Sequence, residues 1–177
     1  MPGINIELQM VNHITVGTVG APGNRTFLLQ ASDALDTVTL KMEKEQTRAL
    51  AHAANELLEN LNDQYPDEAP SLSYPLSTDL ALREPTDPLF AIGQIGLGYD
   101  RNRDMIVLAV QELLLDESEE PSTARFWITR SQAQALSRYA LEVIEQGRPI
   151  CPLCGRPMEL GKICCPRVNG HYKALLQ

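Results

Sequence analysis

The first 150 residues of this chain contain no cysteine, because all four cysteines lie within the last 27 residues. Disulfides that stabilise a fold are usually spread along the chain and persist in oxidising compartments. The segment from Met1 to Val11 lacks the basic start and long apolar stretch of a secretory signal. The longest apolar run, Met105 to Val110, has six residues and is far short of a membrane span. We therefore expect a cytoplasmic protein without a membrane segment, whose cysteines bind metal or carry out redox chemistry.

Positive charge is scarce in most of the chain. Residues 1–146 contain 10 Lys and Arg against 22 Asp and Glu, a net charge of −12. Residues 147–177 contain five Lys and Arg against Glu159 alone, a net charge of +4. Neutralising phosphates requires clustered cations, so the acidic part disfavours general nucleic-acid binding. Only the tail offers cations for that purpose, and they are Arg156, Lys162, Arg167 and Lys173.

Recognisable catalytic motifs are also missing. The glycines at 93, 96 and 98 do not follow the Gly-x-Gly-x-x-Gly order of a dinucleotide site, and no Walker lysine follows them. His13 and His52 have no matched Ser or Cys nucleophile in a known motif. The sequence therefore favours a protein without enzymatic activity.

An internal repeat is the main feature of the first 147 residues. Residues 44–59 align with residues 130–145 at a constant offset of 86, and both segments have the apolar spacing of amphipathic helices. Thr129 or Ser131 can cap the start of the second segment, and Gly147 and Pro149 end it. The identical pairs are Gln46/Gln132, Ala49/Ala135, Leu50/Leu136, Ala54/Ala140, Glu56/Glu142 and Glu59/Glu145.

Strand-like segments precede each of the two helical segments. They are residues 14–17, 26–30 and 37–42 in the first half, and 90–93, 105–110 and 124–129 in the second. We therefore predict an α+β fold in which two tandem β-β-β-α repeats form one pseudo-symmetric antiparallel sheet with both helices on one face. The expected divisions are a first repeat at 1–61, a Pro-rich and acidic connection at 62–88, a second repeat at 89–147, and a zinc-ribbon-like knuckle at 148–177.

The cysteine spacing in the last segment predicts a metal site. Cys151 and Cys154 form a Cys-x-x-Cys turn, which supplies two ligands to a tetrahedral zinc ion. Cys165 lies a suitable loop length further on. The fourth ligand is either Cys164 or His171, and the pattern of residues leaves both open. Adjacent Cys164 and Cys165 bind together only if the backbone kinks, because neighbours in an extended chain point in opposite directions.

A closed four-ligand zinc site is structural, since catalysis requires an open coordination position. The alternative is a reduced Cys-x-x-Cys pair with redox activity. Such a pair usually begins a helix beside a βαβ unit, whereas this one follows the end of a helix. We therefore predict one structural Zn²⁺ and no other cofactor.

Three motifs resemble a bacterial family of uncharacterised proteins, known as a domain of unknown function and as a "repeat protein". They are Val16–Ala31, Glu43–Gln46, and the Gly147–Gly155 segment together with Cys165–Gly170. The resemblance covers nearly the whole chain and implies a bacterial cytosolic protein without an assigned activity. The family pattern has His two residues before the last cysteine. Here that position is Ile163, which favours Cys164 over His171 as the replacement ligand.

Three functions follow as expectations. The first is a zinc-binding, non-enzymatic protein-interaction or regulatory module, with another protein as its partner. The second is an accessory protein for nucleic acid or transcription, which would use the basic tail. The third is a small-molecule-binding enzyme with a cleft between the two halves, where Arg25, Gln30 and Gln46 would meet an anionic molecule. The oligomeric state has no signal in the sequence.

Overall fold

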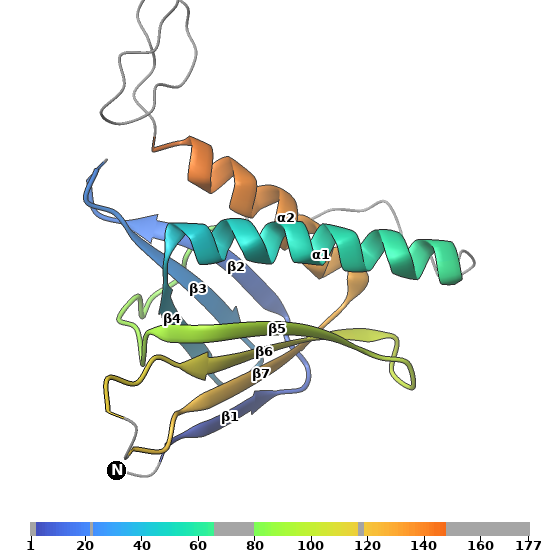
Figure 1. The fold of residues 1–177 in the computed structure, drawn as a ribbon, viewed down its shortest axis with the longest axis horizontal. Coiled ribbons are helices and arrows are strands. Elements are labelled where there is room, and N and C mark those ends of the chain that lie inside the picture. The colour runs from blue at the N-terminus through green and yellow to red at the C-terminus, as the bar shows by residue number, and fades with distance from the viewer. Residues whose placement is uncertain (1–2, 22, 66–79, 117–118, 148–177) are drawn as a thin grey trace, which may run out of the picture.

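The structure is a computed structural model that describes residues 3–21, 23–65, 80–116 and 119–147. It is a mixed α+β fold with two helices and two sheets (Figure 1). Its elements in chain order are β1 (Asn5–Leu8), β2 (His13–Val19), β3 (Thr26–Ser32), β4 (Thr37–Met42), α1 (Lys44–Gln64), β5 (Ile92–Asp100), β6 (Met105–Glu112), β7 (Thr123–Ile128) and α2 (Arg130–Glu145).

The strands form two sheets, whereas the sequence favours one antiparallel sheet. One sheet has the order β2-β3-β4, and the other has the order β1-β7-β6-β5. The two meet through a parallel bridge between Lys41 and Ala91, just before β5 begins. Beyond this bridge β5 pairs with β6. Twisted sheets with many strands commonly split into packed sheets, because twist accumulates from strand to strand.

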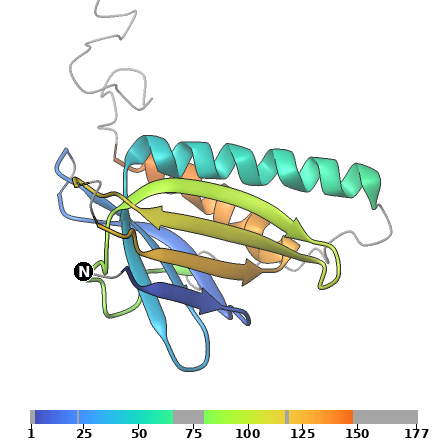
Figure 2. The same cartoon turned by 60° about the horizontal axis from the view of Figure 1, so that its bottom comes forward.

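The strand β1 is absent from the sequence-based prediction. It lies at an edge of the four-stranded sheet and runs parallel to β7, with Asn5 opposite Thr123 (Figure 2). The prediction of a purely antiparallel arrangement is therefore wrong at this edge. A strand of four residues with one buried position has too little alternation to be recognised locally.

Both helices lie together on one side of the strands, as the sequence predicts (Figures 1 and 2). They contact each other through Ser137, whose Oγ donates to the carbonyl oxygen of Ala51 at 2.9 Å and to Oδ1 of Asn55 at 2.7 Å. One hydrophobic core includes residues of both sheets and both helices, among them Val16, Leu50, Phe126 and Leu136. The halves are therefore parts of one packed unit.

Both helices begin with a glutamine three residues after the N-cap. The N–H of Glu43 donates to Oε1 of Gln46 at 2.8 Å, and the N–H of Thr129 donates to Oε1 of Gln132 at 2.9 Å. Thr129 also accepts from the backbone of Gln132, which confirms it as the N-cap of α2. The helix α1 extends to Gln64, beyond the boundary expected at residue 61.

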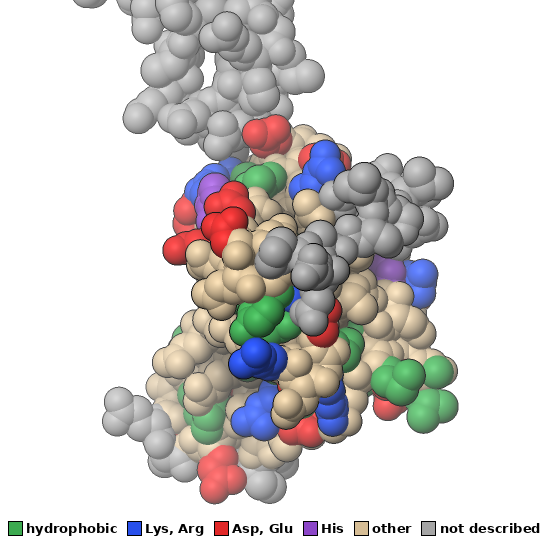
Figure 3. Space-filling model, turned by 90° about the vertical axis from the view of Figure 1, so that its right-hand side faces the viewer, with side chains coloured by type: hydrophobic (Ala, Val, Ile, Leu, Met, Phe, Trp, Pro, Cys, Tyr) green, Lys and Arg blue, Asp and Glu red, His purple; other side chains and the backbone are tan. Residues whose placement is uncertain are grey.

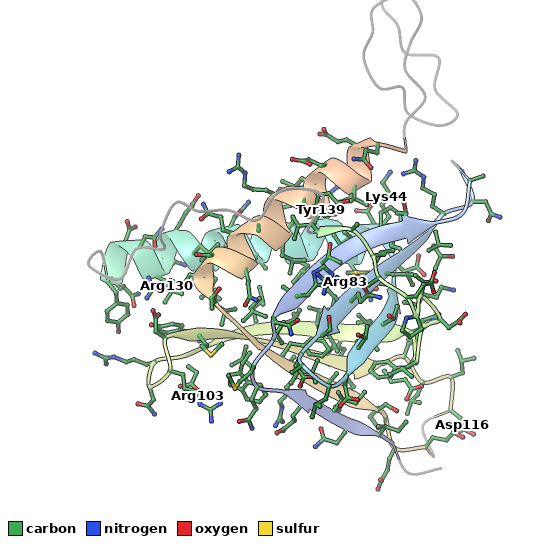
Figure 4. The ribbon with its side chains drawn as sticks, turned by 180° about the vertical axis from the view of Figure 1, so that it is seen from behind. Lys44, Arg83, Arg103, Asp116, Arg130 and Tyr139 are labelled. Carbon is green, nitrogen blue, oxygen red and sulfur yellow. The ribbon has the colours of Figure 1, made fainter. Side chains whose placement is uncertain are left out.

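A segment of the connection, residues 80–90, covers the outer face of the three-stranded sheet, and we call it the strap. Gln30 is fully buried there: its Nε2 donates to the carbonyl oxygen of Arg83 at 2.7 Å, and its Oε1 accepts from the N–H of Arg83 at 2.7 Å. Thr39 donates to the carbonyl oxygen of Pro85 at 2.8 Å, and Thr15 donates to that of Leu80. Figure 4 shows Arg83 in front of this sheet. Polar side chains on three neighbouring strands thus bind the strap backbone.

Candidate functional site

A large cavity lies where α1 begins and α2 ends, and we call it the helix-start pocket. Its volume is about 720 Å³. The end of the β2–β3 hairpin, the end of β4, the first turns of α1 and the end of α2 contribute its walls. The lining residues are Gly23, Asn24, Arg25, Thr26, Phe27, Lys41, Met42, Glu43, Lys44, Glu45, Arg48, Ile144 and Gly147.

Arg25 connects the β2–β3 hairpin to the end of α2. Its Nη2 donates to the carbonyl oxygen of Gln146 at 3.0 Å, where the dipole of α2 favours a cation. Its Nη1 is buried and has no hydrogen-bond partner among the described residues. A Cβ at Gly147 would lie 3.0 Å from Nη1, so the glycine leaves room for the guanidinium. Arg25 therefore keeps one donor that a bound anion can satisfy.

Three further cations line the pocket beside the start of α1. They are Lys41, Lys44 and Arg48, and Figure 4 shows Lys44 next to the end of α2. Arg48 donates to Oε1 of Glu45 at 2.6 Å, and this hydrogen bond lowers the pKa of Glu45. With Glu43 included, the lining carries four positive and two negative side chains. The N–H groups of the first helical turn add partial positive charge.

The positive balance of this pocket contrasts with the rest of the body. Four of the ten Lys and Arg in residues 1–146 line it, although that region has a net charge of −12. A concave site with this charge distribution attracts a small anion, and its walls focus the field of the cations. The described lining has the chemistry of a binding site for a phosphate- or carboxylate-bearing group.

The three residues expected in a cleft between the halves do not meet in one site. Arg25 lines the helix-start pocket. Gln30 is buried beneath the strap on the outer face of β3, and Gln46 lines a separate cavity between α1 and β5. Side-chain alternation along β3 explains the separation, because Gln30 faces away from the core to which Leu29 and Ala31 belong. Lys41, Lys44 and Arg48 were missed, since their proximity to Arg25 depends on the tertiary fold.

A second polar cluster lies where the β5–β6 hairpin meets the start of α2. Arg130 is 3 % exposed, and its Nε donates to Oδ1 of Asp104 at 2.9 Å. Tyr99 donates to the same oxygen at 2.7 Å, and this bond raises the pKa of Tyr99. Burial lowers the pKa of Arg130, but its bonds to Tyr99 and Asp104 outweigh this effect and raise it. The cluster connects the hairpin to the helix and was not recognised in the sequence.

Charge is mixed on the side of the molecule toward which this hairpin projects. Figure 3 shows Lys and Arg side chains interspersed with acidic ones there, and a small hydrophobic group among them. Arg103 lies over the ring of Trp127 at 5.9 Å, and Arg101 lies over the ring of Tyr65 at 5.3 Å. Aromatic faces that arginines already cover offer little surface for stacking with bases. This end of the molecule is a weaker candidate site than the helix-start pocket.

The predicted zinc ligands lie outside the described residues. This applies to Cys151, Cys154, Cys164, Cys165 and His171. Within the described ranges, no group of three or more His, Cys, Asp or Glu residues is arranged to hold a metal ion. The same ranges contain no helix with the length and hydrophobicity needed to span a membrane.

Comparison with known proteins gives one match. A family model described as "Protein of unknown function (DUF3090)" matches residues 6–165, which covers most of the chain and all four cysteines. No curated protein and no solved structure matches the chain. Because the match includes both halves and extends to Cys165, the chain belongs to the DUF3090 family.

Proposed function

We propose that this protein is a non-enzymatic cytoplasmic module that binds a small anionic group in the helix-start pocket. The observation that carries the proposal is the convergence of Arg25, Lys41, Lys44 and Arg48 on one cavity of an otherwise acidic body. The buried Nη1 of Arg25, without a partner among the described residues, supplies a donor directed at such a ligand. Phosphate and carboxylate oxygens are the natural acceptors for guanidinium and ammonium groups.

Thermal unfolding and calorimetric titration with inorganic pyrophosphate test this proposal. A ligand that binds only the native state stabilises it by about 2.7 kcal/mol at roughly 100 times its Kd. We expect stabilisation that weakens as salt increases, because exposed charges are screened. Sodium chloride at equal ionic strength gives the reference for salt alone.

A pair of double variants makes the test specific to the pocket. Lys41→Gln with Lys44→Gln removes two cations from the lining, and we expect binding to weaken at least about tenfold, equivalent to about 1.4 kcal/mol. Arg83→Gln with Arg101→Gln removes the same charge elsewhere and should leave binding within about twofold. If both double variants bound pyrophosphate equally weakly, the loss of affinity would come from net charge alone, which would contradict a defined site.

We also propose a structural zinc ion in the tail, held by Cys151, Cys154, Cys165 and either Cys164 or His171. The Cys-x-x-Cys spacing supports the site. The family match over residues 6–165 includes all four cysteines. A metal held in this way would stabilise a tail that recruits a protein partner or, through its cations, nucleic acid.

Metal analysis and Co²⁺ substitution distinguish the two ligand sets. We expect about one zinc ion per chain, and Cys151→Ser should abolish its tight binding. If Cys164 is the fourth ligand, Cys164→Ser weakens binding and reduces the thiolate-to-metal absorption of the Co²⁺ form, whereas His171→Ala leaves both unchanged. Less than about half an equivalent of metal in the wild-type protein would contradict the zinc proposal.

The body is proposed to be a tandem β-β-β-α repeat, and matching contacts in the two halves support this. Gln46 donates to the carbonyl oxygen of Ile92 at 2.9 Å, and its counterpart Gln132 donates to that of Val11 at 2.8 Å. Each helix is thus hydrogen-bonded to the other half where a strand begins: α1 at the start of β5, and α2 just before β2. Ala51 and Ser137, which are 86 residues apart, meet where the helices cross. Equal losses of stability in Gln46→Leu and Gln132→Leu would agree with such a repeat.

A further inference from the structure

A groove between α1 and the edge of β5 has no role in the proposals above. Its volume is about 250 Å³, and it shares no lining residue with the helix-start pocket. Ala49 and Ala53 on α1 are exposed, and Ile95 and Leu97 on β5 are half-buried. We call it the β5 groove, and its lining residues are Gln46, Ala49, Leu50, Ala53, Gly93, Ile95 and Leu97.

The strand β5 is an edge strand without the usual protection. It has nine residues, and among the described residues its only strand partner is β6. It contains no Pro or Lys, and three of its residues are glycines, at positions 93, 96 and 98. Gln46 of α1 donates to the carbonyl oxygens of Ile92 and Gly93, and the edge beyond them presents backbone donors and acceptors to an approaching extended chain. A groove with apolar walls therefore runs beside an open backbone edge.

The corresponding position in the other half is occupied by the strap. A cavity of about 140 Å³ between α2 and β2 is lined by Asn12, Ile14, Gln132 and Ala135, which match Gly93, Ile95, Gln46 and Ala49 of the β5 groove. Leu80 and Arg83 of the strap also line this cavity. Leu80 is buried there, and Ala135 is 5 % exposed, whereas its counterpart Ala49 is exposed. The strap thus covers in one half a position that no described residue covers in the other.

Two matched glycines show the same difference. Gly17 lies opposite Leu28 and Gly98 lies opposite Val107, at corresponding positions of β2 and β5. A Cβ at Gly17 would lie 2.5 Å from Cγ of Leu82, so the strap lies directly on this glycine. A Cβ at Gly98 would have no neighbour within 4 Å among the described residues. Leu80 and Leu82 therefore cover two sites in the first half whose counterparts are left uncovered by the described part of the chain.

We propose that the β5 groove and Gly98 bind an extended segment of a partner protein with two apolar side chains two residues apart. The first side chain enters the groove beside Ala49, as Leu80 enters its cavity beside Ala135, the counterpart of Ala49. The second lies on Gly98, as Leu82 lies on Gly17. The segment resembles the strap sequence Leu80-Ala-Leu-Arg in its chemistry. This inference rests on the correspondence between the halves and is independent of the anion pocket.

The strap itself is not available to a second copy of this chain. It is already bound, because Gln30 makes two hydrogen bonds of 2.7 Å to Arg83 of the strap and Thr39 donates to the carbonyl oxygen of Pro85. Releasing it to serve a second copy would leave the buried carboxamide of Gln30 without partners, which is unfavourable.

A synthetic peptide with the sequence of residues 80–88 is the probe, titrated to millimolar concentration into the isotope-labelled full chain. We expect saturable changes in the NMR resonances of Ala49, Ala53, Gly96 and Gly98. Trp127, the only tryptophan, lies on the same outer face of the sheet as Gly98, so its fluorescence should change in parallel. A peptide of the same composition with its two leucines adjacent should bind at least about threefold more weakly, because adjacent side chains point to opposite sides.

A matched pair of variants locates the binding site on α1. Ala53→Glu places a charge in the β5 groove and should reduce peptide affinity at least about tenfold, while His52→Glu, exposed on α1 outside the lining, should not change it. Thermal unfolding of both variants verifies that they fold. The absence of saturable changes, equal binding by Ala53→Glu, or a wild-type dimer that Ala53→Glu dissociates would each overturn the proposal. The double variant Lys41→Gln with Lys44→Gln should lose anion binding and keep peptide binding. This result would show that the helix-start pocket and the β5 groove are separate sites.

Discussion

Arg130 illustrates how a charged residue at a helix start can become part of a core contact. Its guanidinium is buried, and its Nη2 lies 2.9 Å from Oδ1 of Asp104 and donates to the hydroxyl of Tyr99 at 3.1 Å. Asp104 adopts a positive φ of 49° in the β5–β6 turn, which brings its carboxylate to α2. A buried cation is tolerated only when it is paired and hydrogen-bonded, so this contact fixes the orientation of the hairpin relative to the helix.

Replacing Arg130 by Met should destabilise the protein by about 2 kcal/mol, because Tyr99 and Asp104 lose a charged hydrogen-bond partner. Urea unfolding measures the change. Arg138→Met, at an exposed position of the same helix, is the control and should change stability by less than about 0.5 kcal/mol. Equal effects at the two positions would mean that the cluster contributes nothing beyond the loss of a surface charge.

Tyr99 should ionise at higher pH in the folded protein than in the unfolded chain, because its hydroxyl donates to Asp104. A raised pKa in the folded state means that its contribution to stability is present below the unfolded pKa and is lost as the pH rises through the folded pKa. Absorbance titration of wild type and Tyr99→Phe isolates this residue. The two titration curves should differ at a pH above the range in which tyrosines ordinarily ionise. A difference within that ordinary pH range would contradict the assigned hydrogen bond.

At the scale of elements, the strap covers the outer face of the β2-β3-β4 sheet. Its backbone is bound by side chains of all three strands, and Leu82 lies on Gly17. The open sheet β5-β6-β7 has no such cover among the described residues, and Gly98 there has free space around it. A side chain in place of glycine would therefore meet the strap at position 17 but no described residue at position 98.

Gly17→Val and Gly98→Val form a test of this difference. At Gly17 the new side chain would displace Leu82, and we expect a loss of about 1–3 kcal/mol from overpacking. At Gly98 the space is open and valine favours strands, so the change should be neutral or slightly stabilising. Chemical denaturation gives both values. If the two variants lost equal stability, the strap would not lie on Gly17 in solution.

The part of the whole molecule that the structure describes has one hydrophobic core. Core residues run from Leu8 to Ile144 and come from both sheets and both helices. A chain of this length buries enough apolar surface to fold without a metal. Gly147 lines the helix-start pocket, and Cys151 follows four positions later in the sequence, so the proposed anion site and the proposed zinc site are neighbours along the chain.

Removal of metal with EDTA should therefore leave the unfolding temperature of the body nearly unchanged, because both sheets and both helices already supply a core within the described residues. Circular dichroism during thermal unfolding measures this. Cys151→Ser should behave like the chelated wild type, which controls for effects of the chelator itself. A fall of more than about 5 °C, equivalent to roughly 1–2 kcal/mol, would mean that the tail contributes to the core.

The sequence alone determined the local elements. The bounds of β4 were predicted to the residue, and α2 was predicted with Thr129 as one of two possible caps, because apolar periodicity, helix caps and polar–apolar alternation are local signals. The turns at Gly20–Gly23 and Asp100–Asp104 also follow from local turn chemistry, and the structure has hairpins at both. The tail was assigned a metal site on spacing alone, and this stays a prediction.

Tertiary structure alone decided the division into two sheets, the parallel pairing of β1 with β7, the burial of Gln30 and Arg130, and the assembly of the helix-start pocket. Each depends on residues far apart in sequence, such as Ile4, which donates to Ser122 118 positions away, or Arg25, which binds Gln146 121 positions away. Periodicity reports which face of an element is apolar, but the partner that covers this face is set by packing of the whole chain. The candidate anion site is also a feature that only the tertiary structure decided, because its cations converge only when the hairpin, α1 and the end of α2 meet.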